Sequence, residues 1–248
     1  MALVFLPALA RMAVCGGTHG NELSGVYVVQ EMERQRKEKG EGTLYPYTLQ
    51  NSSSCFCLRS PITDSSPYEV RRAQELNNLL GLKGSTDATD MICDLHNTTS
   101  NMGLTLIHYT SSDWVTLHIC KYLQTKITKV PAVDLTIDWI HKFNSGTVFE
   151  GGDVEAFKFI KSFDYPRDPE TRTLTAAIHP QLQDRDFCLL KQGDPLFFKF
   201  SGETVKYEEE ETLHPFFINE AAYYEKGIAF HLAKKLTLTI PTVQVQKD

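Results

Sequence analysis

The sequence lacks several features that would assign it to a common functional class. It has no apolar run of about 18 residues, so a transmembrane helix is not expected. Its net charge is −6 without any block of Lys and Arg, and a duplex-binding protein would usually carry a basic patch, so no nucleic-acid partner is expected. A glycine-rich phosphate loop, a GxSxG nucleophile elbow and a Cys-His nucleophile pattern are also missing. Nucleotide-dependent and covalent serine or cysteine chemistry are therefore disfavoured.

The six cysteines include no pair with CxxC spacing. Cys15 and Cys93 lie in apolar, strand-like runs, where a free thiol behaves as a small hydrophobe. This usage favours a reducing compartment over a disulfide framework. The N-terminal run MALVFLPALARMAV lacks a basic segment, so a secretory signal is not expected and a cytoplasmic location is predicted.

The composition is that of an ordered globular chain. With 248 residues, 42% hydrophobic and 23% charged, the chain can bury a sizeable core as one large or two small domains. The glycine-rich stretch at residues 144–152 is a plausible domain boundary, and the sequence after it has the pattern of short strands separated by turns. We therefore predict an α/β domain over residues 1–145 and a smaller β-rich C-terminal domain over residues 146–248.

The hydrophobic patterns predict alternating strands and helices in the first domain. Residues 43–66 are rich in Ser, Cys and Pro without a helical or strand period, and we expect disorder there. The predicted strands are residues 12–15, 91–95 and 104–109, and the predicted helices are residues 22–39, 67–80, 112–126 and 130–143.

Two predicted strand ends are followed by metal-binding residue types. The strand at residues 12–15 ends at two glycines and is followed by His19 and Glu22, and the strand at residues 91–95 is followed by His96. Two imidazoles and one carboxylate are the ligand set of catalytic zinc in hydrolases, with the fourth position left to water. A short HxxE spacing alone is weak, since such residues commonly form ordinary local hydrogen bonds.

Four longer stretches make the pattern specific. GGTHGNE, PYEVRRAQELN, DLHNTTSNMG and INEAAYYEK, in this order, resemble the aspartoacylase family of zinc amidohydrolases. HPQLQDRDF and FINEAAYYEKG are more similar to the aminoacylase branch that acts on N-acyl aromatic amino acids than to aspartoacylase itself. The resemblance covers most of residues 12–240. It implies a zinc-carboxypeptidase-like mixed sheet with flanking helices, plus a β-rich module that shapes the substrate channel.

The resemblance also implies roles for individual residues. His19, Glu22 and His96 would hold one Zn²⁺ per chain, and Tyr223 would bind the substrate carboxyl group. Thr98 is expected to contact substrate, although local loop hydrogen bonds are the alternative for a threonine in this place. Asp94 would face the same side of its strand as His96, so it is either a carboxylate supporting that ligand or a charge paired elsewhere.

Two sequence motifs of the family are absent from this chain. Residues 43–66 do not show the Asn-Pro turn and the Asp-Leu-Asn-Arg tetrapeptide that form part of the family's substrate site. The segment between residues 126 and 133 lacks the family motif that contains the general-base glutamate and an arginine. Glu150 and Glu155 are the nearest acids, and neither matches the family base. The catalytic base is therefore unknown, and internal segments of the family pattern are missing.

Two functions remain open from the sequence. The first is a zinc-dependent amidohydrolase that cleaves the amide of N-acyl amino acids, with N-acetyl aromatic amino acids or S-conjugates favoured over N-acetyl-aspartate. The second is a catalytically impaired zinc-binding relative or truncated isoform. The expected partner is a small N-acyl amino acid, and the sequence leaves a homo-oligomer open.

Overall fold

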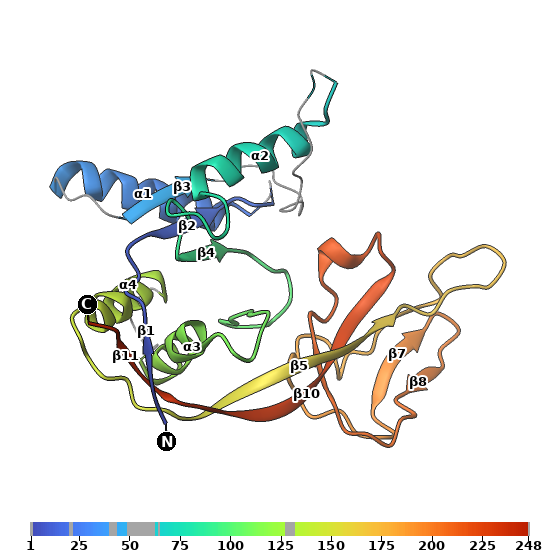
Figure 1. Cartoon of the computed structure of the whole chain (residues 1–248). Helices are drawn as coiled ribbons and strands as arrows, with labels where there is room; N and C mark the ends of the chain where they lie inside the picture. Colours follow the sequence, from blue (N-terminus) through green and yellow to red (C-terminus); the bar gives the residue numbers. More distant parts are fainter. Residues whose placement is uncertain are drawn as a thin grey trace. The chain divides into compact units, whose positions relative to one another are not determined.

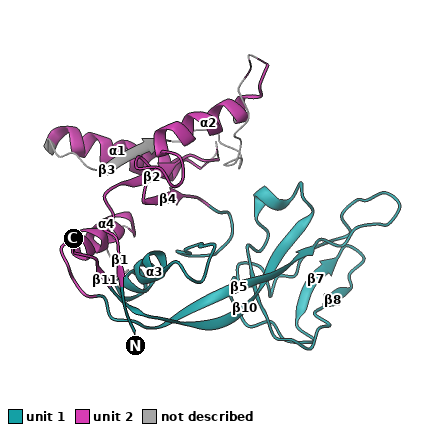
Figure 2. Cartoon of the chain, viewed as in Figure 1, with its two compact units in different colours: residues 1–4, 98–128, 149–243 teal, residues 5–97, 129–148, 244–248 magenta. Residues whose placement is uncertain are grey.

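The chain divides into two compact units that are each built from several stretches (Figure 2). The computed structural model describes residues 2–19, 22–39, 44–48, 63, 65–126 and 132–247. Unit 1 contains residues 1–4, 98–128 and 149–243, and unit 2 contains residues 5–97, 129–148 and 244–248. The chain changes units near the proposed domain boundary at residue 145 and also directly after residue 97, so the division at 145 stays a proposal.

Unit 2 is organised around a three-stranded parallel sheet in the order β3-β2-β4. The central strand β2 (Met12–Gly16) is buried along its whole length, as expected of a parallel strand with both faces covered. It lies between β3 (Leu44–Thr48) and β4 (Met91–Leu95). The apolar run MAVCG therefore forms the centre of the sheet.

Two helices cover opposite faces of β2. Helix α2 (Tyr68–Leu80) follows Pro67. Its residues Leu76 and Leu80 lie one helical turn apart on the same face and pack against Ala13 and Cys15. Helix α1 (Leu23–Lys39) approaches the other face, since a Cβ at Gly16 would meet its backbone. Side chains alternate between the faces of a strand, so odd and even positions of β2 contact different helices.

Helix α4 (Ala132–Asn144) also belongs to unit 2 and is strongly amphipathic. Trp139 and Phe143 are fully buried one turn apart and stack with ring centroids 5.0 Å apart. At the end of the helix, the Asn144 side chain accepts a hydrogen bond from the Leu9 backbone N–H and donates one to the Leu9 carbonyl, which anchors the N-terminal segment.

Unit 1 contains two antiparallel sheets. In the first, the long strands β5 (Gly152–Asp164) and β10 (Ile228–Ile240) run side by side as a twisted ribbon, with β9 (His214–Phe216) on the other edge of β10 (Figure 1). The second sheet has the order β6-β7-β8. Its strands are β6 (Ala176–Ile178), β7 (Pro195–Lys199) and β8 (Thr204–Lys206).

The core of unit 1 is rich in aromatic and aliphatic side chains. Phe197 and Phe230 lie with ring centroids 5.9 Å apart and are both completely shielded from solvent. Helix α3 (Trp114–Lys126) packs Leu117 against a separate small cluster on β5 and β10. Strands β1 (Leu3–Leu6) and β11 (Thr242–Val245) form a further two-stranded sheet.

Most predicted elements are confirmed, and two predictions are wrong. Residues 104–109 form no strand; Leu104 and Ile107 are exposed there, and no strand of the described part pairs with this segment. A strand needs a hydrogen-bonded neighbour, which the local pattern LTLIHY cannot supply. Conversely, β3 lies in the stretch where we expected no element, while residues 49–62 and 64 lie outside the described residues. No described helix is both long and apolar enough to cross a membrane.

Candidate metal centre

The register of the parallel sheet brings the two predicted metal-binding loops together. Gly16 at the end of β2 is paired with Leu95 at the end of β4. His19 and His96 therefore follow neighbouring strand ends, at the carboxyl edge where open α/β sheets hold their ligands. Two residues that are 77 positions apart in the sequence thus share one site.

A close backbone contact positions the third residue. Glu22 precedes α1, and this helix approaches the sheet at Gly25, where an added Cβ would lie 2.9 Å from both Gly16 Cα and the Leu95 carbonyl oxygen. Only glycine permits this approach without displacement of the helix. The Gly16–Gly25 contact therefore holds the N-terminal end of α1 against both strands.

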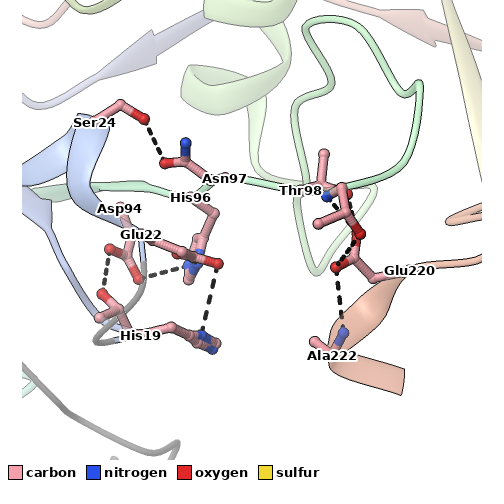
Figure 3. A network of polar contacts seen from close by, with 11 residues as sticks. His19, Glu22, Ser24, Asp94, His96, Asn97, Thr98, Glu220 and Ala222 are labelled. Carbon is pink, nitrogen blue, oxygen red and sulfur yellow. Dashed lines mark hydrogen bonds and ion pairs between the residues drawn. The ribbon is translucent and has the colours of Figure 1, made fainter. Parts of the chain in front are cut away.

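His19, Glu22 and His96 converge as the ligand set predicts (Figure 3). One ligand atom of each residue lies within 4.8 Å of the other two. The Nδ1 atom of His96 is 2.9 Å from Glu22 Oε2, and the Nδ1 atom of His19 is 3.8 Å from Glu22 Oε1. Glu22 is buried while the two imidazoles are more exposed, so the grouped atoms remain open to solvent from the histidine side.

The second nitrogen of His96 has its own partner. Its Nε2 atom is 2.9 Å from Asp94 Oδ2, and the Thr18 hydroxyl donates a 2.6 Å hydrogen bond to Asp94 Oδ1 (Figure 3). The hydrogen bond to Asp94 is the largest cause that raises the pKa of His96 to about 9. Burial acts to raise the pKa of Asp94, but the hydrogen bonds from His96 and Thr18 outweigh it and the pKa is lowered. Of the two alternatives for Asp94, the structure has the one in contact with His96.

The predicted substrate residue Thr98 lies in unit 1 and is hydrogen-bonded to a carboxylate. Its hydroxyl donates to Glu220, which also accepts hydrogen bonds from Thr99 N–H at 2.9 Å, Thr99 Oγ1 at 3.1 Å and Ala222 N–H at 3.4 Å (Figure 3). Glu220 is only 8% exposed. The Thr98 hydroxyl therefore already has a protein acceptor, and its role in substrate binding remains a prediction.

Tyr223 closes the short helix η1 (Ala221–Tyr223), directly after Glu220. Its ring lies 4.9 Å from that of His231 and 5.6 Å from that of Phe217 between centroids. Burial, and then the charge of Glu220, raise the pKa of the Tyr223 hydroxyl. The described residues provide no hydrogen-bond partner for this hydroxyl, so a half-buried donor remains available to a ligand.

The acids nearest to the missing general base in sequence are engaged in unit 1. Glu155 forms an ion pair with Lys235 at 2.5 Å, and Glu150 accepts a 3.2 Å hydrogen bond from the Thr242 hydroxyl. Sequence reasoning missed Thr18, because its partner is 76 residues away and a loop threonine carries no signal of its own. The ligands could be found because the stretches around them resemble the aspartoacylase family, whereas the HxxE spacing alone is a weak signal.

Comparison with known families gives a consistent result over most of the chain. Residues 55–136 match the succinylglutamate desuccinylase/aspartoacylase catalytic domain, and residues 152–235 match the AstE/AspA barrel-sandwich hybrid domain. The chain is 66% identical to N-acyl-aromatic-L-amino acid amidohydrolase (carboxylate-forming) A of Danio rerio, covering 99% of this chain and 95% of the relative. The chain belongs to the aspartoacylase family. It is also 36% identical to the Homo sapiens amidohydrolase of the same type, over 95% of this chain and 93% of the relative.

A solved structure of this family has the same fold. Murine aminoacylase 3 matches with a TM-score of 0.86 at 32% identity, covering 96% of this chain and 99% of the other. The mixed α/β class is thereby confirmed. The alignment with the first zebrafish relative spans 313 positions, at least 65 more than the 248 residues of this chain, so that relative contains internal segments that this chain lacks. The difference in length agrees with the absence of the two family motifs from this sequence.

Proposed function

We propose that this chain hydrolyses the amide bond of N-acyl amino acids, with one Zn²⁺ held by His19, Glu22 and His96. The observation that carries the proposal is the convergence of these three side chains at the ends of two adjacent parallel strands. Zinc ligands lie about 2.0–2.2 Å from the ion, so their atoms are at most about 4.4 Å apart. Ligand atoms within 4.8 Å of one another need only small side-chain rotations to meet that limit.

The metal ligands and Tyr223 have separate roles in the proposed hydrolysis. Bound zinc supplies a Lewis acid and a water of lowered pKa. Glu22 and the two imidazoles contribute one negative charge, which leaves the centre with a net positive charge toward a carbonyl oxygen. Tyr223 offers a hydroxyl that can donate a hydrogen bond to a substrate carboxylate. The substrate class follows the relatives, which are named for N-acyl aromatic amino acids, so we propose these over N-acetyl-aspartate.

The compartment is proposed from the thiols. Cys15, Cys93, Cys120 and Cys188 are free, and burial raises the pKa of each. Cys15 and Cys120 are buried and the other two are partly buried, and free thiols with raised pKa values are compatible with a reducing cytoplasm.

One observation favours the alternative of an impaired zinc-binding relative. The family base and arginine are not matched, and the longer alignment shows that internal segments of the relative have no counterpart here. Loss of a general base costs about 10²–10⁴-fold in rate. The names of the relatives favour the deacylase, and the two functions differ in turnover but agree on metal binding.

The test combines metal content with turnover. Purified wild type is expected to contain one zinc per chain by atomic absorption, and His96→Ala is expected to lose it. His141→Ala, an exposed histidine on α4 of the same unit, is the matched control and is expected to keep the metal. Release of free amine from N-acetyl-tyrosine supports the deacylase. Stoichiometric zinc without turnover supports the alternative, and unchanged zinc in His96→Ala refutes the proposed centre.

A further inference from the structure

We propose that Asp94 is the positioning residue of the metal centre: it orients His96 through Nε2, and Thr18 holds Asp94 in place. The inference rests on the proposed function, because it treats His96 as a metal ligand. It extends that function by assigning the orientation of the ligand to two further side chains. Both lie in unit 2 together with the three ligands.

The two nitrogens of His96 face different partners. Nδ1 lies 2.9 Å from Glu22 Oε2, on the side of the grouped ligand atoms, while Nε2 lies 2.9 Å from Asp94 Oδ2. A neutral imidazole carries one N–H and one lone pair. A carboxylate at Nε2 retains the N–H there and leaves the Nδ1 lone pair directed toward a metal.

The strand geometry explains why Asp94 can reach His96. Asp94 lies in β4 and His96 follows the strand two positions later, so both side chains lie on the same side of the backbone. The same strand residue is in register with Cys15 of β2. Asp94 is therefore next to the loop that leaves β2 and carries the other histidine.

Thr18 fixes the free oxygen of the carboxylate. Its hydroxyl donates to Asp94 Oδ1 at 2.6 Å, and the residue is 7% exposed. Thr18 directly precedes His19, so the chain Thr18–Asp94–His96 connects both ligand loops. With one oxygen on Thr18 and the other on His96, the carboxylate has a single orientation, and rotation of the imidazole would break a charge-assisted hydrogen bond.

The experiment measures zinc affinity in competition with a chromogenic chelator at fixed pH. Removal of a carboxylate that supports a ligand histidine lowers metal affinity about 10–100-fold, and we expect this for Asp94→Ala. Asp94→Asn retains an acceptor oxygen and is expected to fall between Ala and wild type. Thr18→Val is expected to weaken binding less than Asp94→Ala and to add nothing in the Asp94→Ala background. Asp90→Asn, whose carboxylate accepts a hydrogen bond from the Arg11 backbone N–H, is the matched control.

A second readout is independent of the metal. In ¹⁵N-edited proton NMR of the metal-free protein, the Nε2–H of His96 is expected as a protected downfield signal. This signal should persist in Asp90→Asn and disappear in Asp94→Ala; its survival in Asp94→Ala would overturn the proposal.

The outcomes separate the two proposals. A wild type that binds zinc while Asp94→Ala and Thr18→Val bind it equally tightly overturns the positioning role and leaves the proposed function intact. A wild type that binds no zinc overturns both. If Asp94→Ala fails to fold, as judged by its urea transition, Asp94→Asn and Thr18→Val decide the outcome, because each nearly preserves the volume of the side chain.

Discussion

Replacement of Glu220 by alanine should strongly destabilise unit 1. The Glu220 carboxylate is 8% exposed and accepts hydrogen bonds from the segment at residues 98–100 and from Ala222. These donors lie 120 or more residues before their acceptor, with the exception of Ala222. The carboxylate therefore joins the segment after β4 to the segment that carries Tyr223.

The magnitude follows from the donors that would lose their acceptor. The Thr98 hydroxyl and the backbone N–H and hydroxyl of Thr99 donate to Glu220 and have no other acceptor among the described residues. Ser100 also donates to Glu220, but its N–H has a second acceptor in Thr98 Oγ1 and its hydroxyl has one in the Ile218 carbonyl. A buried donor without an acceptor costs about 1–3 kcal/mol. Because Thr98 and Thr99 are exposed and part of their hydrogen bonding can be regained from water, we expect a loss of about 2–4 kcal/mol for Glu220→Ala. Glu220→Gln keeps the shape and one oxygen, so a loss of about 1–3 kcal/mol is expected.

Urea denaturation provides the assay. With a slope of about 1–3 kcal/mol per molar urea, Glu220→Ala should lower the midpoint by about 1 M or more. Glu225→Gln, an exposed glutamate in the same segment, should leave the midpoint unchanged. A Glu220→Ala midpoint equal to that of Glu225→Gln would refute the inferred network.

The same residue predicts a pH dependence. Burial acts to raise the pKa of Glu220, but hydrogen bonds from Thr98, Ala222 and Thr99 outweigh it, so the folded-state pKa lies below the ordinary value. A lowered folded-state pKa gives a stabilisation that is complete above the unfolded-state pKa and is lost as the pH falls through the folded-state pKa. The stability difference between wild type and Glu220→Gln should therefore be constant near neutral pH and shrink below about pH 4. A difference that grows on acidification would contradict this assignment.

Two further substitutions test the site locally. Gly25→Ala should destabilise the protein by about 1–3 kcal/mol in urea denaturation, because the new Cβ would overlap the β2 and β4 backbones, and this cost outweighs the higher helix propensity of alanine. Gln30→Ala, at an exposed position of the same helix, should leave the urea midpoint unchanged. Equal urea midpoints for the two variants would exclude the close backbone contact at Gly25. If the chain is active, Tyr223→Phe should lower kcat/KM about 10–100-fold through loss of a hydrogen bond to a charged group. Tyr224→Phe, whose hydroxyl bonds Asn219, should have little effect, and similar kinetics for both variants would refute the substrate role of Tyr223.

Local patterns predicted the elements where burial and sequence period agree. Strand β2 is a continuous apolar run with all five positions buried, and α2 follows a proline and ends before Gly81. The prediction failed at residues 104–109, where apolar alternation is present but no described neighbour pairs with the segment. It also missed β3, because LYPYT contains a proline and acquires its strand geometry from pairing with β2.

The sequence by itself determined the chemical types of the site and their attachment to strand ends. Two histidines and a glutamate follow predicted strands and have the residue types of a zinc site, and the resemblance of the surrounding stretches to the aspartoacylase family makes this pattern specific. Only the tertiary structure decided the hydrogen-bond partners of the ligand His96, through Asp94, and of the predicted substrate residue Thr98. The hydrogen bonds from Thr18 to Asp94 and from Thr98 to Glu220 join residues 76 and 122 positions apart, and such partners are set by strand register and packing, which no local pattern encodes.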